Sequence, residues 1–164
     1  MKYKQIKKYQ TPIIVLIITV FYIFLRYILI PNSNPDKLIN DFLAGLFLSF
    51  GVLQINTFNS TKEALKKYDF FGKRFDLYNE IFPFAILFFG IALHINEIPV
   101  IVSFITIALF GGQIYEMLKI VKSKKEIKYV SFGAKSSLPV SGLTIGINGL
   151  IVTLGLLLII LEVI

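Results

Sequence analysis

Five long apolar stretches, separated by segments that carry most of the charge, organise this sequence. They cover residues 13–30, 38–55, 81–95, 98–120 and 139–161. An α-helix needs about 20 mostly apolar residues to cross a bilayer, and the third stretch can begin one turn earlier, inside a charged loop. Backbone polar groups in hydrocarbon must be paired within the protein, which helices achieve. The pattern therefore predicts an all-α integral membrane protein with five transmembrane helices in antiparallel succession.

The first apolar stretch follows the basic segment MKYKQIKKYQ, as the apolar core of a signal peptide would. It is longer than a typical signal-peptide core and ends in Ile-Pro-Asn-Ser, without a small-x-small cleavage site. We therefore interpret residues 1–37 as a basic N-terminus, a retained signal-anchor helix and a short turn. Residues 38–164 form the second predicted unit, a four-helix membrane domain. Four prolines are expected near helix starts, where their missing N–H costs little: Pro12, Pro83, Pro99 and Pro139.

Composition supports the membrane interpretation. Hydrophobic residues make up 55% of the 164 residues and charged residues 16%, against about 25% charged residues in soluble proteins. Mean hydropathy is +0.75, which argues against soluble enzymes and disordered tails. The chain contains no cysteine, so it forms no disulfide or thiolate site of its own. One histidine and two methionines leave few ligands for a transition metal, and we expect no bound metal or cofactor.

The positive charge is concentrated on one side of the predicted membrane. With five spans, 15 of the 17 lysine and arginine residues fall in segments 1–12, 56–80 and 119–138. Such asymmetry predicts that the N-terminus is cytoplasmic and the C-terminus periplasmic in a bacterial inner membrane. It also explains the net charge of +7 through topology and contact with anionic lipid, so we expect no nucleic-acid partner.

Pairs of small residues four positions apart indicate where helices can approach closely. They are Gly45 and Ser49, Ala108 and Gly112, and Gly142 and Gly146, the last pair being followed by Gly149. We expect these residues to pack helices inside the bundle. A homodimer through the Gly142 motif is the alternative.

Charged groups within reach of the bilayer are costly and need partners. Arg26 lies four residues before the end of the first span, where it can snorkel to the head groups or pair with Asp41 or Asp36. Glu116 lies three residues before Lys119, a spacing that predicts an ion pair on one helix face.

Asn148 is the deepest strongly polar residue of the last span, and we expect it to make an interhelical hydrogen bond. The sequence shows no pair of acids, no histidine–carboxylate constellation and no phosphate-binding loop. No catalytic residue is therefore assigned.

From about Asp41 onward the chain resembles the MauE/DoxX-like family of redox-associated membrane proteins. Three segments carry the resemblance. The first is Phe42-Leu43-Ala44-Gly45-Leu46-Phe47-Leu48-Ser49-Phe50-Gly51, similar to the first apolar helix of that family. The second runs from Tyr68-Asp69 through Arg74 and Tyr78 to Phe82-Pro83-Phe84 and Gly90, and the third contains Gly133, Leu138-Pro139 and Thr144. The resemblance implies a four-helix bundle formed by the second to fifth spans, with relatives that support electron transfer or the maturation of a periplasmic redox enzyme.

The chain departs from the family pattern at its reactive positions. Tyr129-Val130-Ser131 replaces the Cys-x-Cys pair, Ile86 replaces an intramembrane glutamate, and Ile147-Asn148 replaces an acidic pair. A serine hydroxyl does not exchange with disulfides as a thiolate does. The resemblance therefore implies the family fold without its redox chemistry.

These observations lead to three hypotheses about function. The first is a non-catalytic inner-membrane subunit that docks to and stabilises a partner membrane-protein complex. The second is a redox component that binds a quinone near Asn148 or supports a thiol-bearing partner. The third is a small transporter or channel subunit.

Overall fold

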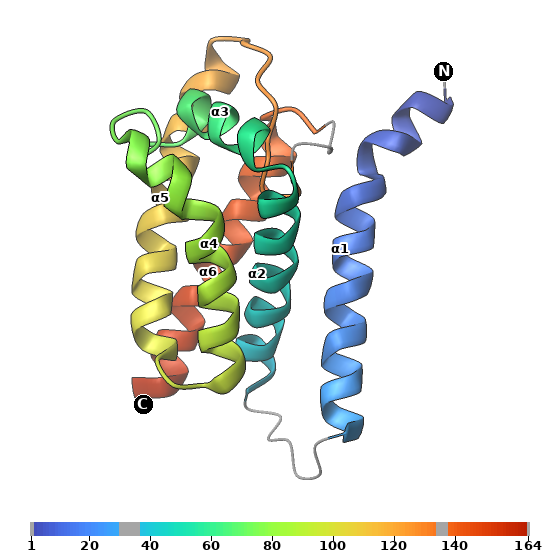
Figure 1. Ribbon diagram of the computed structural model, residues 1–164, viewed down its shortest axis with the longest axis vertical. Helices are drawn as coiled ribbons and strands as arrows, with labels where there is room; N and C mark the ends of the chain where they lie inside the picture. Colours follow the sequence, from blue (N-terminus) through green and yellow to red (C-terminus); the bar gives the residue numbers. More distant parts are fainter. Residues whose placement is uncertain (1, 30–36, 134–137, 164) are drawn as a thin grey trace.

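The protein is a helical bundle with one additional helix beside it. The computed structural model describes residues 2–29, 37–133 and 138–163, and describes the backbone alone for residues 2–9 (Figure 1). Within these ranges the helices are α1 (Lys2–Leu29), α2 (Leu38–Asn56), α3 (Phe58–Tyr68), α4 (Asp76–Ile95), α5 (Pro99–Lys122) and α6 (Gly142–Val163). All except α3 are long and apolar enough to cross a membrane. The predicted class, an all-α multi-pass membrane protein, is confirmed.

The packing divides the spans into two closely paired sets. The most extensive helix contacts join α2 to α4 and α5 to α6, while α1 packs mainly on α2. Only 11% of the apolar span of α1 is buried, against 56% for α2. Figure 1 shows α1 alongside α2 at the edge of the bundle. The first helix is therefore an addition to a four-helix bundle formed by α2, α4, α5 and α6.

Three of the four expected proline positions differ from the prediction. Helix α1 begins at Lys2, so Pro12 lies inside it and not near its start. Helix α4 begins at Asp76, so Pro83 lies well inside it and is buried. Helix α6 begins at Gly142, so Pro139 precedes it and forms an antiparallel bridge with Lys128. Pro99 does occupy the first turn of α5. Apolar residues alone do not mark a helix start, because a buried turn is just as apolar as the first turn of a helix.

A short amphipathic helix, α3, was not predicted. It follows α2 directly and crosses the end of the bundle (Figure 1). Its buried residues are Thr61, Ala64, Leu65 and Tyr68, a spacing that places them on one helix face. The signal was present in the sequence, but the lysines between these positions made the segment resemble a charged loop.

The charge asymmetry is visible in the structure. Helix α3, the residues between α3 and α4, and the connection between α5 and α6 all lie at the same end as the N-terminus (Figure 1). We call this end, defined by residues 2–12, 57–75, 120–133 and 138–141, the basic end, and the opposite end the far end. Ten described positive side chains lie on these segments or beside them: Lys62, Lys66, Lys67, Lys73, Arg74, Lys119, Lys122, Lys124, Lys125 and Lys128.

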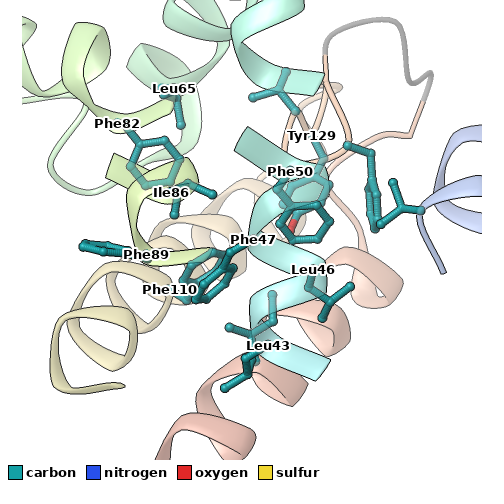
Figure 2. Packing of buried hydrophobic residues seen from close by; sticks show 14 of the residues in the cluster. Leu43, Leu46, Phe47, Phe50, Leu65, Phe82, Ile86, Phe89, Phe110 and Tyr129 are labelled. Atoms are coloured by element: carbon teal, nitrogen blue, oxygen red, sulfur yellow. The ribbon is translucent and has the colours of Figure 1, made fainter. Parts of the chain in front are cut away.

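Aromatic and branched side chains fill the interior between the paired helices. Phe47 of α2 stacks on Phe110 of α5, with ring centroids 5.8 Å apart and planes at 10°. Phe50 meets Phe132 of the α5–α6 connection edge to face at 5.1 Å. Figure 2 shows Phe82 and Ile86 of α4 lying toward this cluster. The core therefore joins all four bundle helices and the connection at the basic end.

Two glycines allow the close contact between α2 and α4. A Cβ added to Gly51 would lie 2.7 Å from the Leu87 Cα, and one added to Gly90 would lie 2.7 Å from the Leu48 backbone nitrogen. Distances this short leave no room for any side chain. The two backbones can approach only because both positions are glycine.

Replacing Gly51 with alanine is expected to lower the free energy of unfolding by about 1–3 kcal/mol, the usual cost of overpacking a filled interior. Gly146→Ala is the matched control, because it changes another helical glycine whose added Cβ has no described atom within 4 Å. Circular dichroism during thermal unfolding in detergent measures both variants. Equal loss of stability in the two variants would show that the α2–α4 contact is not the cause.

Candidate functional site

Buried polar side chains form a connected network beneath the basic end. Its members are Asp69, Tyr78, Gln113, Tyr129 and Asn148, and we call them the basic-end network. They come from the α3–α4 turn, α4, α5, the α5–α6 connection and α6 in that order. Asp69, Gln113, Tyr129 and Asn148 are fully buried. The network is therefore an internal structure that joins three spans and two connections.

Asp69 forms the centre of the turn between α3 and α4. Its Oδ1 accepts hydrogen bonds from the backbone N–H groups of Phe71 and Gly72, each at 2.8 Å. Its Oδ2 accepts from Tyr78 Oη at 3.1 Å and from Gln113 Nε2 at 2.7 Å. The first pair of bonds is an Asx-type turn, which Asp favours through its short acceptor side chain. The second pair ties this turn to α4 and α5.

The network continues through amide groups into α6. Gln113 Oε1 accepts a hydrogen bond from Asn148 Nδ2 at 3.0 Å. Asn148 Nδ2 also lies 3.5 Å from Met117 Sδ, and Asn148 Oδ1 accepts from Tyr129 Oη. The interhelical hydrogen bond expected of Asn148 is therefore made to α5. Gln113 and Tyr129 were not predicted as its partners, because residues 35 and 19 positions away come together only in the folded bundle.

Burial changes the ionisation of this site. Removal from water raises the pKa of Asp69, and the hydrogen bonds from Gly72, Gln113, Tyr78 and Phe71 oppose that rise. Burial also raises the pKa of the Tyr129 hydroxyl, so Tyr129 stays protonated and remains a donor at neutral pH. A carboxylate that accepts several hydrogen bonds can stay charged without a cation beside it. The arrangement holds the Asp69 carboxyl group in place and positions the backbone of Phe71 and Gly72 around it.

Glu116 lies nearby on α5 but belongs to a separate ion-pair cluster. Its Oε1 lies 3.3 Å from Lys119 Nζ, the i,i+3 pair that the spacing predicts. Its Oε2 pairs with Lys73 Nζ from the α3–α4 turn. Both lysines are at least one-third exposed, while Glu116 is 6% exposed. Lys73 was not predicted as a partner because it lies 43 residues away.

A second polar cluster fastens α1 to the bundle near the far end. Arg26 Nη1 lies 2.7 Å from Asp41 Oδ1 of α2. The same nitrogen donates to the carbonyl of His94 on α4 at 3.1 Å and to Tyr22 Oη at 3.3 Å. Tyr22 Oη in turn lies 2.5 Å from His94 Nδ1. The structure thus pairs Arg26 with Asp41; Asp36, the other predicted partner, lies outside the described residues.

The predicted small-residue pairs fall in different environments. A Cβ added to Gly45 would lie 3.0 Å from Tyr22 Cδ1, so α1 packs closely against α2 at Gly45. Ser49 lines a groove between α1 and α2. A Cβ added to Gly112 would lie 3.1 Å from the Phe70 Cβ of the α3–α4 turn, whereas Ala108 is exposed. Of these two pairs, only Gly45 supports a close helix–helix contact.

The glycines of α6 do not pack inside the bundle, contrary to our expectation. For Gly142, Gly146 and Gly149, no described atom lies within 4 Å of an added Cβ. Gly155, which was not predicted, faces α5 instead, with Ile107 Cγ1 3.4 Å from its added Cβ. Sequence spacing identifies a small-residue face but not its direction, because all faces of a membrane helix can be apolar.

Of the positions in the predicted family pattern, Asp69 and Tyr129 belong to the basic-end network. Tyr68 and Tyr129 are buried with ring centroids 5.8 Å apart. Ser131 is buried, and its carbonyl accepts a hydrogen bond from Gln54 Nε2 at 3.3 Å. Gly133 has a φ of 74°, a conformation that favours glycine. Ile86, at the glutamate position of the pattern, is fully buried in the apolar core.

Comparisons of the chain with protein-family models, with curated proteins and with solved structures find no match. The resemblance to the MauE/DoxX-like family therefore stays a prediction. The class of protein defined by the fold is a multi-pass helical membrane protein.

Replacing Gln113 with leucine is expected to lower the free energy of unfolding by about 1–3 kcal/mol, the cost of leaving buried polar groups without partners. The change removes a donor from Asp69 and an acceptor from Asn148. Gln54→Leu is the matched control, since Gln54 is equally buried but makes one longer bond, at 3.3 Å. Chemical unfolding in detergent compares the two. A larger loss for Gln54→Leu would contradict the importance of the network.

The Arg26–Asp41 pair is expected to show a coupling free energy of about 1–3 kcal/mol in a double-mutant cycle of Arg26→Gln and Asp41→Asn. Asp41 is 1% exposed, so loss of Arg26 leaves a buried charge without its cation. The exposed pair Lys66–Asp76, in which Asp76 is 81% exposed, is the control and should show little or no coupling, because solvent screens it. Similar coupling in the two cycles would contradict a special role for Arg26 in holding α1.

Proposed function

We propose that this protein is a non-catalytic subunit of the bacterial inner membrane that docks to a second integral membrane protein through α6. The observation that carries the proposal is the open face of α6. Gly142, Gly146 and Gly149 lie there with no described neighbour within 4 Å of an added Cβ. Helices in membranes associate where small residues let their backbones approach, so this face suits a transmembrane helix of the partner.

The surroundings of the α6 glycines support a helix as the occupant. Thr153 continues the face, is exposed, and donates its hydroxyl to the Gly149 carbonyl at 2.9 Å. It therefore adds a small side chain without an unpaired polar group. Charged residues do not occur between Gly142 and Leu161. Close packing of apolar and small groups would hold such a contact, without ion pairs.

The polar clusters support a structural role for this chain. Both polar groups of the Asn148 amide have partners. Its Nδ2 contacts Gln113 and Met117, and its Oδ1 accepts a hydrogen bond from Tyr129. A quinone near Asn148, as the redox alternative requires, would have to displace one of these contacts. The Asp69 carboxylate likewise accepts hydrogen bonds on both oxygens.

The basic end is placed in the cytoplasm in this proposal. Cytoplasmic loops of membrane proteins carry an excess of lysine and arginine, and the described positive side chains collect at that end. The N-terminus is then cytoplasmic and the C-terminus periplasmic. The resemblance to a family associated with periplasmic redox enzymes suggests that the partner belongs to such a membrane complex.

Replacing Gly146 with isoleucine is expected to abolish recovery of the partner while the chain still folds. The branched side chain would separate the two helices, and its Cβ position has no described atom of this chain within 4 Å. The tagged protein is expressed in its own cells and purified in mild detergent, and the proteins recovered with it are measured by quantitative mass spectrometry. Gly111→Ile on α5 is the matched control, since an added Cβ there also has no described atom within 4 Å.

The proposal expects one membrane protein in stoichiometric amount with the wild type and with Gly111→Ile, and its loss with Gly146→Ile. Recovery of the same partner with all three proteins would contradict docking through α6. A self-associated dimer that Gly146→Ile dissociates would instead assign this face to a second copy of the chain.

A further inference from the structure

An apolar groove runs between α1 and α2 on the side where the two helices diverge. It encloses about 490 Å³ and is lined on α1 by Thr11, Ile14 and Ile18. The α2 side contributes Ser49 and Val52, and Phe132 and Gly133 line the basic end. The size falls in the range of small-molecule sites in proteins, about 300–1,000 Å³.

The groove is closed toward the far end and opens toward the basic end. At its closed end Gly45 meets Tyr22 and Thr19 of α1, with an added Cβ only 3.0–3.1 Å from those side chains. The Arg26–Asp41 pair holds α1 against α2 beyond this point. At the open end the lining includes Thr11 and Asn56. A molecule in the groove would therefore have its apolar part inside and its polar part at the basic end.

The length of the groove matches one leaflet of the bilayer. From Thr11 to Tyr22 the helix rises about 17 Å at 1.5 Å per residue. Half of a hydrocarbon core about 30 Å thick is about 15 Å. One extended acyl chain, entering from the head-group region at the basic end, fits this depth.

Charge at the open end favours an anionic head group. Helix α1 continues beyond Thr11 for two more turns and carries Lys2, Lys4, Lys7 and Lys8 in that segment. On the other side, α3 begins directly after Thr57, which lines the groove, but its Lys62 and Lys66 pair with Glu80 and Asp76 of α4. The positive charge at the open end therefore comes from the lysines of α1. Lysines close to a membrane surface attract anionic lipids.

We infer that the α1–α2 groove is a binding site for an anionic phospholipid of the leaflet at the basic end. One acyl chain lies between the helices, with its end near Gly45, and the phosphate lies beside the first turns of α1, whose sequence carries four lysines. The lipid fills the space that α1 leaves beside the bundle, which explains how a helix with so little buried surface keeps a defined position.

Tryptophan fluorescence tests this inference without background, because the chain contains no tryptophan. Val52→Trp on α2 and Ile14→Trp on α1 each place one tryptophan in the groove. The variants are reconstituted into phosphatidylcholine vesicles that contain either brominated phosphatidylglycerol or brominated phosphatidylcholine, both of which quench tryptophan on contact. We expect brominated phosphatidylglycerol to give half-maximal quenching at about fivefold lower mole fraction, the effect of one lysine near an anionic lipid.

Ile81→Trp on α4 is the matched control outside the groove. Ile81 and Val52 have similar exposure, 51% and 57%, and each lies about one turn from the basic end of its helix. The two brominated lipids should quench Ile81→Trp with similar midpoints. In the Val52→Trp background, Lys7→Gln with Lys8→Gln should remove the preference for phosphatidylglycerol while leaving quenching by phosphatidylcholine unchanged.

Equal quenching by the two lipids at both groove positions would overturn the inference. The same preference at Ile81→Trp would also overturn it, because it would show general accumulation of anionic lipid around the protein. Quenching by an added quinone that phosphatidylglycerol does not relieve would assign the groove to a quinone instead. Helical content and gel filtration show whether each variant folds. If Val52→Trp does not fold, the test relies on Ile14→Trp.

Discussion

The requirement that polar groups in a membrane find partners inside the protein governs this structure, and the hydrogen bonds of Asp69 satisfy it at the basic end. The carboxylate orders its own turn through Phe71 and Gly72 and reaches α5 through Gln113. Asn148 extends the connection to α6. Because each group in this series depends on the next, the position of one helix is linked to the position of the others.

Apolar packing and hydrogen bonding position different helices of the bundle. The glycine contacts of Gly51 and Gly90 set the separation of α2 and α4, and the Asp69 series joins α4 to α5 and α6. Helix α1 is held by a close contact at Gly45, by an ion pair with Asp41 and by hydrogen bonds of Arg26 and Tyr22 to His94 of α4. The remaining surface of α1 is open toward lipid, which is why the groove beside it is the natural place for a lipid chain.

The exposed face of α6 has a related explanation. Gly155 faces inward toward α5, whereas Gly142, Gly146 and Gly149 face outward. Lipid chains fill the space above glycines less well than a helix does, since small residues bring two backbones within packing distance. The two glycine sets therefore suit different roles, one inside this chain and one toward a partner.

The sequence alone determined the five spans and the end at which positive charge collects, since hydropathy and charge are local properties that act on each segment independently. It also indicated the ion pairs of Arg26 and Glu116, whose partners Asp41 and Lys119 lie close in the chain. Tertiary structure decided what Asn148, Gln113 and Tyr129 contact, which glycines face inward, and that α3 is a helix lying across the bundle. These features depend on helix rotation and on contacts between distant segments, and a uniformly apolar helix carries no sequence signal that fixes its rotation.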